Sequence, residues 1–325
     1  MTTIRELAQP LRGIIPPMVT PLASPDKLDH SAVERLTEHL LGGGVHGLFI
    51  LGTCGEGLSL GHNLRRELVD QVCRQVDGRV PVLVSITDTS RAESINLARF
   101  AADSGADAVV LAAPCYYSLD QEELLEYARS VVREVPLPVV LYNMPALTKV
   151  IYAPTTVRRL MEEESIVGLK DSSGDLGYFE TIRQVTRERA DWAIFTGAEH
   201  LLTRSLDLGG DGGVCGGANI WPQLFVQIYD GETSLTDTAL ADHKEVINDL
   251  VDKADRLGQI YGSVATGSSM VKGLKAALAA MGICGETVAP PLQNCSATER
   301  RRIERLIQSL GVESTLMCSL KTVAR

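Results

Sequence analysis

The chain has 325 residues, of which 45% are hydrophobic and 22% charged, and its formal net charge is −10. This composition is typical of a folded globular protein and leaves room for disorder only at the ends. The acidic balance argues against nucleic-acid binding, which needs a basic surface. No apolar run approaches the length of a membrane span.

The seven cysteines form an odd set without a C-x-x-C pair. This pattern fits the reduced thiols of a cytoplasm better than a framework of disulfides. The amino-terminal residues include an early acid, Glu6, and lack the apolar stretch of a secretory signal. The sequence therefore predicts a soluble, cytoplasmic protein.

Up to about residue 230, apolar runs typical of strands alternate with amphipathic segments typical of helices. The predicted strands are residues 13–19, 47–51, 81–86, 108–112, 138–142, 166–170, 192–196 and 212–215. The predicted helices are residues 31–41, 63–76, 90–104, 121–134, 154–164, 176–189, 201–208 and 222–229. Strands that are apolar throughout indicate a parallel sheet covered by helices. Eight strand–helix units favour an α/β fold of the (β/α)8 or TIM-barrel type.

An open doubly wound sheet is the alternative fold. It is less favoured because no G-x-G-x-x-G follows the first strand, where a dinucleotide site would need it. Beyond residue 230 we predict only helices, at 236–261, 268–280 and 297–310, the last opening with a capping box from Ser296 to Glu299. We expect a barrel domain at 1–230, a C-terminal helical extension at 231–325 packed on it, and a tail at 313–325.

Lys170 ends the predicted strand 166–170 and is followed at once by a polar turn. Burial at such a position disfavours the ammonium form, and a neutral amine in a dry pocket can form a Schiff base with a carbonyl substrate. Taken alone, a surface lysine that closes a strand is the more ordinary interpretation. The other strand ends shift the balance, because barrel enzymes place their chemistry there.

Other predicted strand ends carry groups that could bind or act on a carbonyl substrate. The strand 47–51 leads into Gly52-Thr53-Cys54-Gly55-Glu56, a turn whose backbone N–H groups can hold a carboxylate, with Glu56 expected to orient the loop. A plain tight turn explains it equally well. Tyr117 follows the strand 108–112 and Tyr142 ends the strand 138–142. A tyrosine hydroxyl near the lysine could move protons, although each tyrosine alone can be a packing residue.

The six histidines show no metal-site spacing, and no carboxylate–histidine cluster suggests a bound divalent ion. An imine on Lys170 would itself withdraw electrons, which is the task that a metal performs elsewhere. We therefore predict neither a metal nor a cofactor.

These motifs together resemble the dihydrodipicolinate synthase / N-acetylneuraminate lyase family of class I pyruvate-type aldolases. The similarity extends over about residues 11 to 290. It rests on the following stretches: Gly52-Thr53-Cys54-Gly55-Glu56, Tyr116-Tyr117, Tyr142-Asn143-Met144-Pro145, Gly168-Leu169-Lys170-Asp171-Ser172-Ser173-Gly174, and Gly212-Gly213-Val214 with Ala218-Asn219.

The resemblance implies a role for each catalytic residue. Lys170 would form the Schiff base and Tyr142 would transfer protons over the imine. Thr53 would bridge Tyr142 and Tyr117 in a hydrogen-bonded relay, with Tyr117 supplied across a dimer interface.

The resemblance also implies the binding residues and the partners. Gly52, Thr53 and Cys54 would bind the carboxylate of pyruvate or another 2-oxo acid, and Val214 would contact its methyl end. The second substrate would be an aldehyde, and the assembly a homotetramer made of two dimers.

Three positions bear on the substrate. Cys54 replaces a second hydroxyl of the carboxylate turn, and a thiol is a weak donor. Leu147 stands where dihydrodipicolinate synthases carry an arginine for their aldehyde's carboxylate, and Lys149 lies nearby but at a different position. Glu199 is one of the two acidic residues that sialate-cleaving members tend to carry, so one carboxylate remains for a shorter polyol.

The sequence thus predicts a Schiff-base lyase, an aldolase or dehydratase, of 2-keto-3-deoxy sugar acids or related 2-oxo acids. Dihydrodipicolinate synthase is the second interpretation and N-acetylneuraminate lyase the third. A catalytically silent sensor of 2-oxo acids is an alternative of another class. The complete set of Lys170, Tyr142, Thr53 and Tyr117 argues against a sensor, because a binding protein needs no proton relay.

Overall fold

A computed structural model describes residues 10–234, 240–264 and 268–312. The chain divides into two compact units. The first consists of Met1–Gly13 and Pro81–Val214, and the second of Ile14–Val80 and Cys215–Arg325. The predicted tail at 313–325 lies outside the described residues, and the predicted domain boundary at residue 230 stays a prediction.

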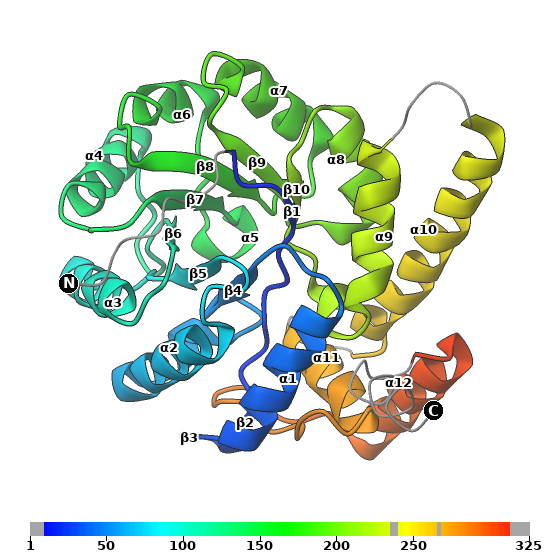
Figure 1. The fold of residues 1–325 in the computed structure, drawn as a ribbon. Helices are drawn as coiled ribbons and strands as arrows, with labels where there is room; N and C mark the ends of the chain where they lie inside the picture. Colours follow the sequence, from blue (N-terminus) through cyan, green and yellow to red (C-terminus); the bar gives the residue numbers. More distant parts are fainter. Residues whose placement is uncertain (1–9, 235–239, 265–267, 313–325) are drawn as a thin grey trace. The chain divides into compact units, whose positions relative to one another are not determined.

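The first unit contains a parallel sheet with helices on its outer side (Figure 1). Its strands are adjacent in the order β10(Gly212–Gly213), β9(Ala193–Thr196), β8(Ile166–Asp171), β7(Val139–Asn143), β6(Ala108–Ala112) and β5(Val82–Ser85). Every residue of these strands is buried. This explains why the sequence shows unbroken apolar runs here instead of an apolar–polar alternation.

Helices in the first unit begin either at a side-chain cap or without one. They are α3(Arg91–Asp103), α4(Gln121–Val132), α5(Pro145–Thr148), α6(Pro154–Leu160), α7(Leu176–Thr186) and α8(Leu202–Asp207). A side-chain cap opens α3, α4 and α7 but not α5, α6 and α8. Asp120 and Glu123 form a capping box at α4, and Asp175 accepts from two backbone N–H groups at α7. Such caps satisfy donors that the first helical turn leaves unpaired, so the capped helices start at a defined residue.

The second unit is mainly helical. It contains β4(Leu48–Ile50) and a small antiparallel hairpin, β2(Leu22–Ser24) with β3(Lys27–Leu28). Its helices are α1(His30–Gly42), α2(His62–Val76), α9(Pro222–Thr233), α10(Leu240–Gly262), α11(Ser269–Ala280) and α12(Ala297–Leu310). The three C-terminal helices and the capping box at Ser296 are confirmed, except that residues 236–239 lie outside the described residues.

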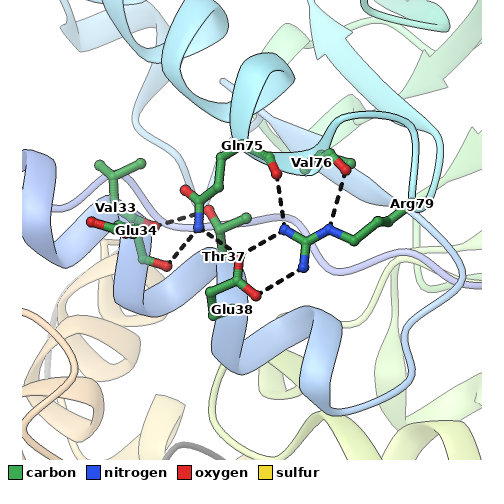
Figure 2. Close-up of polar contacts among 7 residues, drawn as sticks. All are labelled: Val33, Glu34, Thr37, Glu38, Gln75, Val76 and Arg79. Atoms are coloured by element: carbon green, nitrogen blue, oxygen red, sulfur yellow. Dashed lines mark hydrogen bonds and ion pairs between the residues drawn. The ribbon is translucent and has the colours of Figure 1, made fainter.

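Helices α1 and α2 are joined by a polar cluster (Figure 2). The Arg79 guanidinium donates to both carboxylate oxygens of Glu38, at 2.9 and 2.6 Å. The Gln75 amide donates to the same carboxylate and to the Glu34 carbonyl, each at 2.9 Å. The ion pair between Arg79 and Glu38 is roughly half exposed, so it adds little to the free energy of unfolding.

The predicted strand 13–19 is shorter in the structure. β1 covers only Gly13–Ile14, and beyond it Pro17 forms an isolated parallel bridge with Phe49. Proline has no N–H to donate, which interrupts a regular ladder. The hairpin β2–β3 was not predicted, because strands of two or three residues leave no periodic signal.

None of the helices in the described part of the chain is long and apolar enough to cross a membrane.

His39 of α1 should make the folded state sensitive to acid. Its ring is buried and donates to the Ile220 carbonyl at 3.2 Å, and burial lowers the pKa of His39 to about 4. The unfolded histidine binds a proton near pH 6.5 and the folded one only near pH 4. The contribution of the neutral His39 to the free energy of unfolding should therefore be fully present above pH 6.5. It should fall by roughly 3 kcal/mol as the pH drops to 4.

The test is urea unfolding between pH 7 and pH 4. Replacing His39 by glutamine, which keeps a donor for Ile220, should flatten this part of the profile. The matched control is His62→Gln, at an exposed histidine. An unchanged slope in His39→Gln would contradict the assignment.

Candidate active site

Lys170 and Tyr142 lie side by side at the ends of neighbouring strands. Lys170 is 5% exposed and Tyr142 also 5%. The Lys170 Nζ lies 3.9 Å from the centroid of the Tyr142 ring. A cation over an aromatic face is attracted by the ring's quadrupole, so the lysine amine is held beside the tyrosine in a site largely closed to water.

An irregularity in the sheet creates this pairing. The register between β7 and β8 shifts after Val139, which pairs with Ile166, so that Val140 pairs with Gly168 and Tyr142 with Lys170. A one-residue slip in a strand sends every side chain to the opposite face. The bulge therefore decides that lysine and tyrosine share a face.

Gly168 allows β8 to approach β9, its neighbour on the side away from β7. A Cβ at this position would lie 2.5 Å from the Ala193 carbonyl oxygen of β9. Gly197, just beyond β9, has a similar effect on the lysine itself, because a Cβ there would overlap the Ser172 hydroxyl and approach the Lys170 Cε within 3.1 Å. Gly168 therefore lets β8 approach β9, and Gly197 keeps room for the lysine side chain.

Asn143 and Asp171, one residue further along each strand, form a buried hydrogen bond of 2.8 Å between amide and carboxylate. Asp171 also accepts from the Ser173 N–H and hydroxyl, and the Asn143 oxygen accepts from the Tyr152 N–H. Burial raises the pKa of Asp171, against these donors. The pair fixes the two strand ends that carry Tyr142 and Lys170.

Val214 and Glu199 follow the next strands of the same unit. Val214 is buried, and its N–H donates to the Thr196 carbonyl at 2.8 Å, directly after β10. Glu199 opens a short 3-10 turn after β9. Because β10, β9, β8 and β7 are neighbours and parallel, their ends bring Val214, Glu199, Lys170 and Tyr142 to one edge of the sheet.

The loop after β4, in the second unit, contains the predicted carboxylate-binding residues Gly52, Thr53 and Cys54. Leu51 and Glu56 at its two ends have φ values of 59° and 55°, in the left-handed region. The Glu56 N–H donates to the Thr53 carbonyl at 3.1 Å, and the Thr20 hydroxyl to the Gly55 carbonyl at 2.7 Å. The loop is therefore a closed turn of fixed shape.

Cys54 is buried, and its Sγ lies 3.3 Å from the Met270 Sδ of α11. The thiol is thus engaged with a thioether, and carboxylate binding by this loop would use Thr53 and the backbone N–H groups.

Tyr116 and Tyr117 stand on the surface of the first unit. They are 82% and 75% exposed and pack edge to face with ring centroids 5.0 Å apart. Such exposure fits the prediction that Tyr117 serves across an interface between copies. The relay from Thr53 to Tyr142 and Tyr117 stays a prediction.

The described residues include no group of three or more histidine, cysteine, aspartate or glutamate side chains that could hold a metal ion. Within the first unit, neighbouring strands end in or just before Lys170, Tyr142, Val214 and Glu199, and Lys170 and Tyr142 are in contact; the roles of these residues stay predictions. Sequence reasoning gave no role to Asn143 and Asp171. The signal was available, since each directly follows a predicted site residue at the same strand end.

Comparison with known proteins gives the family. The model of the dihydrodipicolinate synthetase family matches residues 10–310. The chain belongs to this family.

Three relatives are informative. The probable 2-dehydro-3-deoxy-D-pentonate aldolase YjhH of Escherichia coli is 33% identical, over 92% of this chain and 97% of its own. A dihydrodipicolinate synthase structure from Bacteroides thetaiotaomicron is 44% identical, with a TM-score of 0.88 over 93% of this chain and 100% of that one. The structure of YagE from Escherichia coli in complex with pyruvate is 28% identical, with a TM-score of 0.86 over 93% and 99%.

These likenesses confirm the (β/α)8 barrel with C-terminal helices. The chain is an enzyme, a lyase of the class I aldolase type.

Asn143→Ala should destabilise the fold. The change would remove the amide donor to the buried Asp171 carboxylate and the amide acceptor of the Tyr152 N–H. We expect a loss of about 2–3 kcal/mol in the free energy of unfolding, measured with urea. The control Asn96→Ala, at an exposed asparagine of α3, should cost less than about 0.5 kcal/mol. Equal losses in both would argue against the locking role.

Proposed function

We propose that this lyase forms a Schiff base between Lys170 and pyruvate-derived 2-oxo acids such as 2-keto-3-deoxy sugar acids. The observation that carries the proposal is the buried Lys170 amine, 3.9 Å from the centroid of the Tyr142 ring at a strand end. Membership in a family of class I aldolase type supports the same chemistry.

In this mechanism the neutral Lys170 amine attacks the ketone carbon, and water leaves as the imine forms. Tyr142 transfers the protons, assisted by Thr53 and by Tyr117 from another copy. The imine withdraws electrons from the neighbouring bond. A retro-aldol step then releases an aldehyde and the pyruvate enamine, which is reprotonated and hydrolysed; loss of water from a 3-deoxy acid uses the same imine.

The binding roles follow the same logic. The carboxylate of the 2-oxo acid binds at Gly52, Thr53 and Cys54, and Val214 packs against the methyl end of pyruvate. Glu199 accepts hydrogen bonds from hydroxyl groups of the sugar part. Two relatives support this substrate class. YjhH is named a probable 2-dehydro-3-deoxy-D-pentonate aldolase, and YagE was solved in complex with pyruvate.

Dihydrodipicolinate synthase is the second candidate, favoured by the 44% identity to the Bacteroides thetaiotaomicron enzyme of that name. The side chain at position 147 argues against it. Leu147 lies in α5, directly after the strand of Tyr142, and is 52% exposed. It has no donor for a second carboxylate, and a charge-assisted pair there would need an arginine.

We further propose a cytoplasmic homotetramer, with one dimer interface at the surface of Tyr116, Tyr117, Leu147 and Ile151. All four side chains are exposed and largely apolar. Exposed large apolar side chains are typical of surfaces that another protein covers when they form a patch.

Borohydride reduction with pyruvate tests the imine. Wild-type protein should gain one reduced pyruvate on the peptide that contains Lys170, as shown by peptide mass mapping. Lys170→Ala should stay folded and lose the adduct and the activity, since no other group replaces the amine. The control Lys27→Ala removes an exposed lysine and should behave as wild type. An adduct in Lys170→Ala would refute the assignment.

A panel of substrates separates the candidate functions. We expect turnover of 2-keto-3-deoxy pentonate or hexonate, detected as pyruvate release, at a rate at least about tenfold above condensation of pyruvate with aspartate semialdehyde. The opposite order would make the protein a dihydrodipicolinate synthase. Cleavage of sialate would favour N-acetylneuraminate lyase, and binding of pyruvate without any product would favour the sensor.

A further inference from the structure

Glu56 and Lys275 form an ion pair in the interior of the second unit. Their side chains are 1% and 0% exposed. The Lys275 Nζ also donates to the Thr287 carbonyl at 2.6 Å, while the second carboxylate oxygen of Glu56 accepts from the Ala289 N–H at 2.6 Å. One loop, one helix and one C-terminal segment therefore meet at these two charges.

Such a pair is costly to bury, since each charge loses its water. Burial lowers the pKa of Lys275, and the Glu56 carboxylate opposes that shift. The Glu38–Arg79 pair in the same unit is by contrast about 38% and 46% exposed. A fully buried pair adds little net stability over apolar side chains, so its presence here points to a role in fixing geometry.

The geometry that the pair fixes is that of the loop after β4. Glu56 is the last residue of this loop before a 3-10 turn and has a φ of 55°. A Cβ at Gly57 would overlap the Leu51 carbonyl, so the loop closes tightly on itself. A non-glycine residue in the left-handed region is strained and persists only where its surroundings hold it.

A second contact joins the same loop to the same helix. The Cys54 Sγ lies 3.3 Å from the Met270 Sδ, and Met270 and Lys275 both belong to α11. Thr53 is thus carried by a loop that α11 holds at Cys54 and Glu56, one and three residues after it.

We propose that Glu56 and Lys275 are positioning residues for the carboxylate of the 2-oxo acid. They do not touch the substrate; they hold the turn so that the Thr53 hydroxyl and the neighbouring N–H groups converge on one anion. The inference rests on the proposed function, because it needs this loop to bind that carboxylate.

Glu56→Gln tests the proposal. The amide keeps an oxygen for the Ala289 N–H but loses the ionic tether to Lys275. The measurement is the half-saturating concentration for borohydride trapping on Lys170, with pyruvate and with methyl pyruvate, which lacks the carboxylate. We expect a rise of about tenfold or more for pyruvate and less than about threefold for methyl pyruvate. A purely structural role would shift both probes alike.

The double variant E56Q/K275M separates position from charge. It removes both charges, so no uncompensated ion remains buried and the fold is retained even if the single variant fails to fold. Thermal stability should recover toward wild type, while the selective loss for pyruvate persists. Recovery of pyruvate affinity in the double variant would show that charge balance, not loop position, was at work, and would overturn the proposal.

Glu38→Gln is the matched control, since it breaks an ion pair of the same unit that joins α1 to α2 (Figure 2). Its ratio of the two half-saturating concentrations should equal that of wild type. Unchanged or tighter pyruvate binding in Glu56→Gln, with normal trapping in wild type, would overturn the positioning role alone. Absence of any Lys170 adduct in wild type would instead overturn the proposed function.

Discussion

The register between β7 and β8 is the constraint on which the site of the first unit depends. A single irregularity after Val139 sets Tyr142 opposite Lys170 and Asn143 opposite Asp171. The first pair then provides the aromatic face and the amine, and the second pair, hydrogen-bonded at 2.8 Å, holds the strand ends in that register. Because side chains alternate along a strand, one bulge decides both the reactive face and the supporting face.

Two different means fix the groups of the proposed site. Lys170 and Tyr142 stand on buried strands, whose ladder hydrogen bonds leave little freedom. The loop of Thr53 has no ladder, and it owes its shape to left-handed residues and to anchors outside itself. Sites on regular elements are held more firmly than sites on loops. The loop has the buried Glu56–Lys275 pair behind it, while the strand ends have the Asn143–Asp171 hydrogen bond.

Much of this arrangement could be predicted from the sequence. Apolar runs that end in Tyr142 and Lys170 marked strand ends, and parallel strands deliver their ends to one edge. The bulge could not be predicted, since it is a tertiary adjustment near Gly168 with no periodic sign. Glu56 was expected to orient its loop, but its partner was not identified: Lys275 stands far along the chain in an apolar helix, and only the fold shows that its ammonium is buried.

The division of the second unit along the chain also has a consequence for synthesis on the ribosome. Residues 14–80 bond with residues made much later, as in Val19 with Asn219, Arg35 with Ile283 and Glu56 with Ala289. Residues 81–214 of the first unit are complete before these partners exist. Non-local contacts of this kind form slowly. The nascent chain can therefore assemble its lysine strand early, while the loop of Thr53 acquires its anchors on α11 and at Ala289 only when translation is nearly finished.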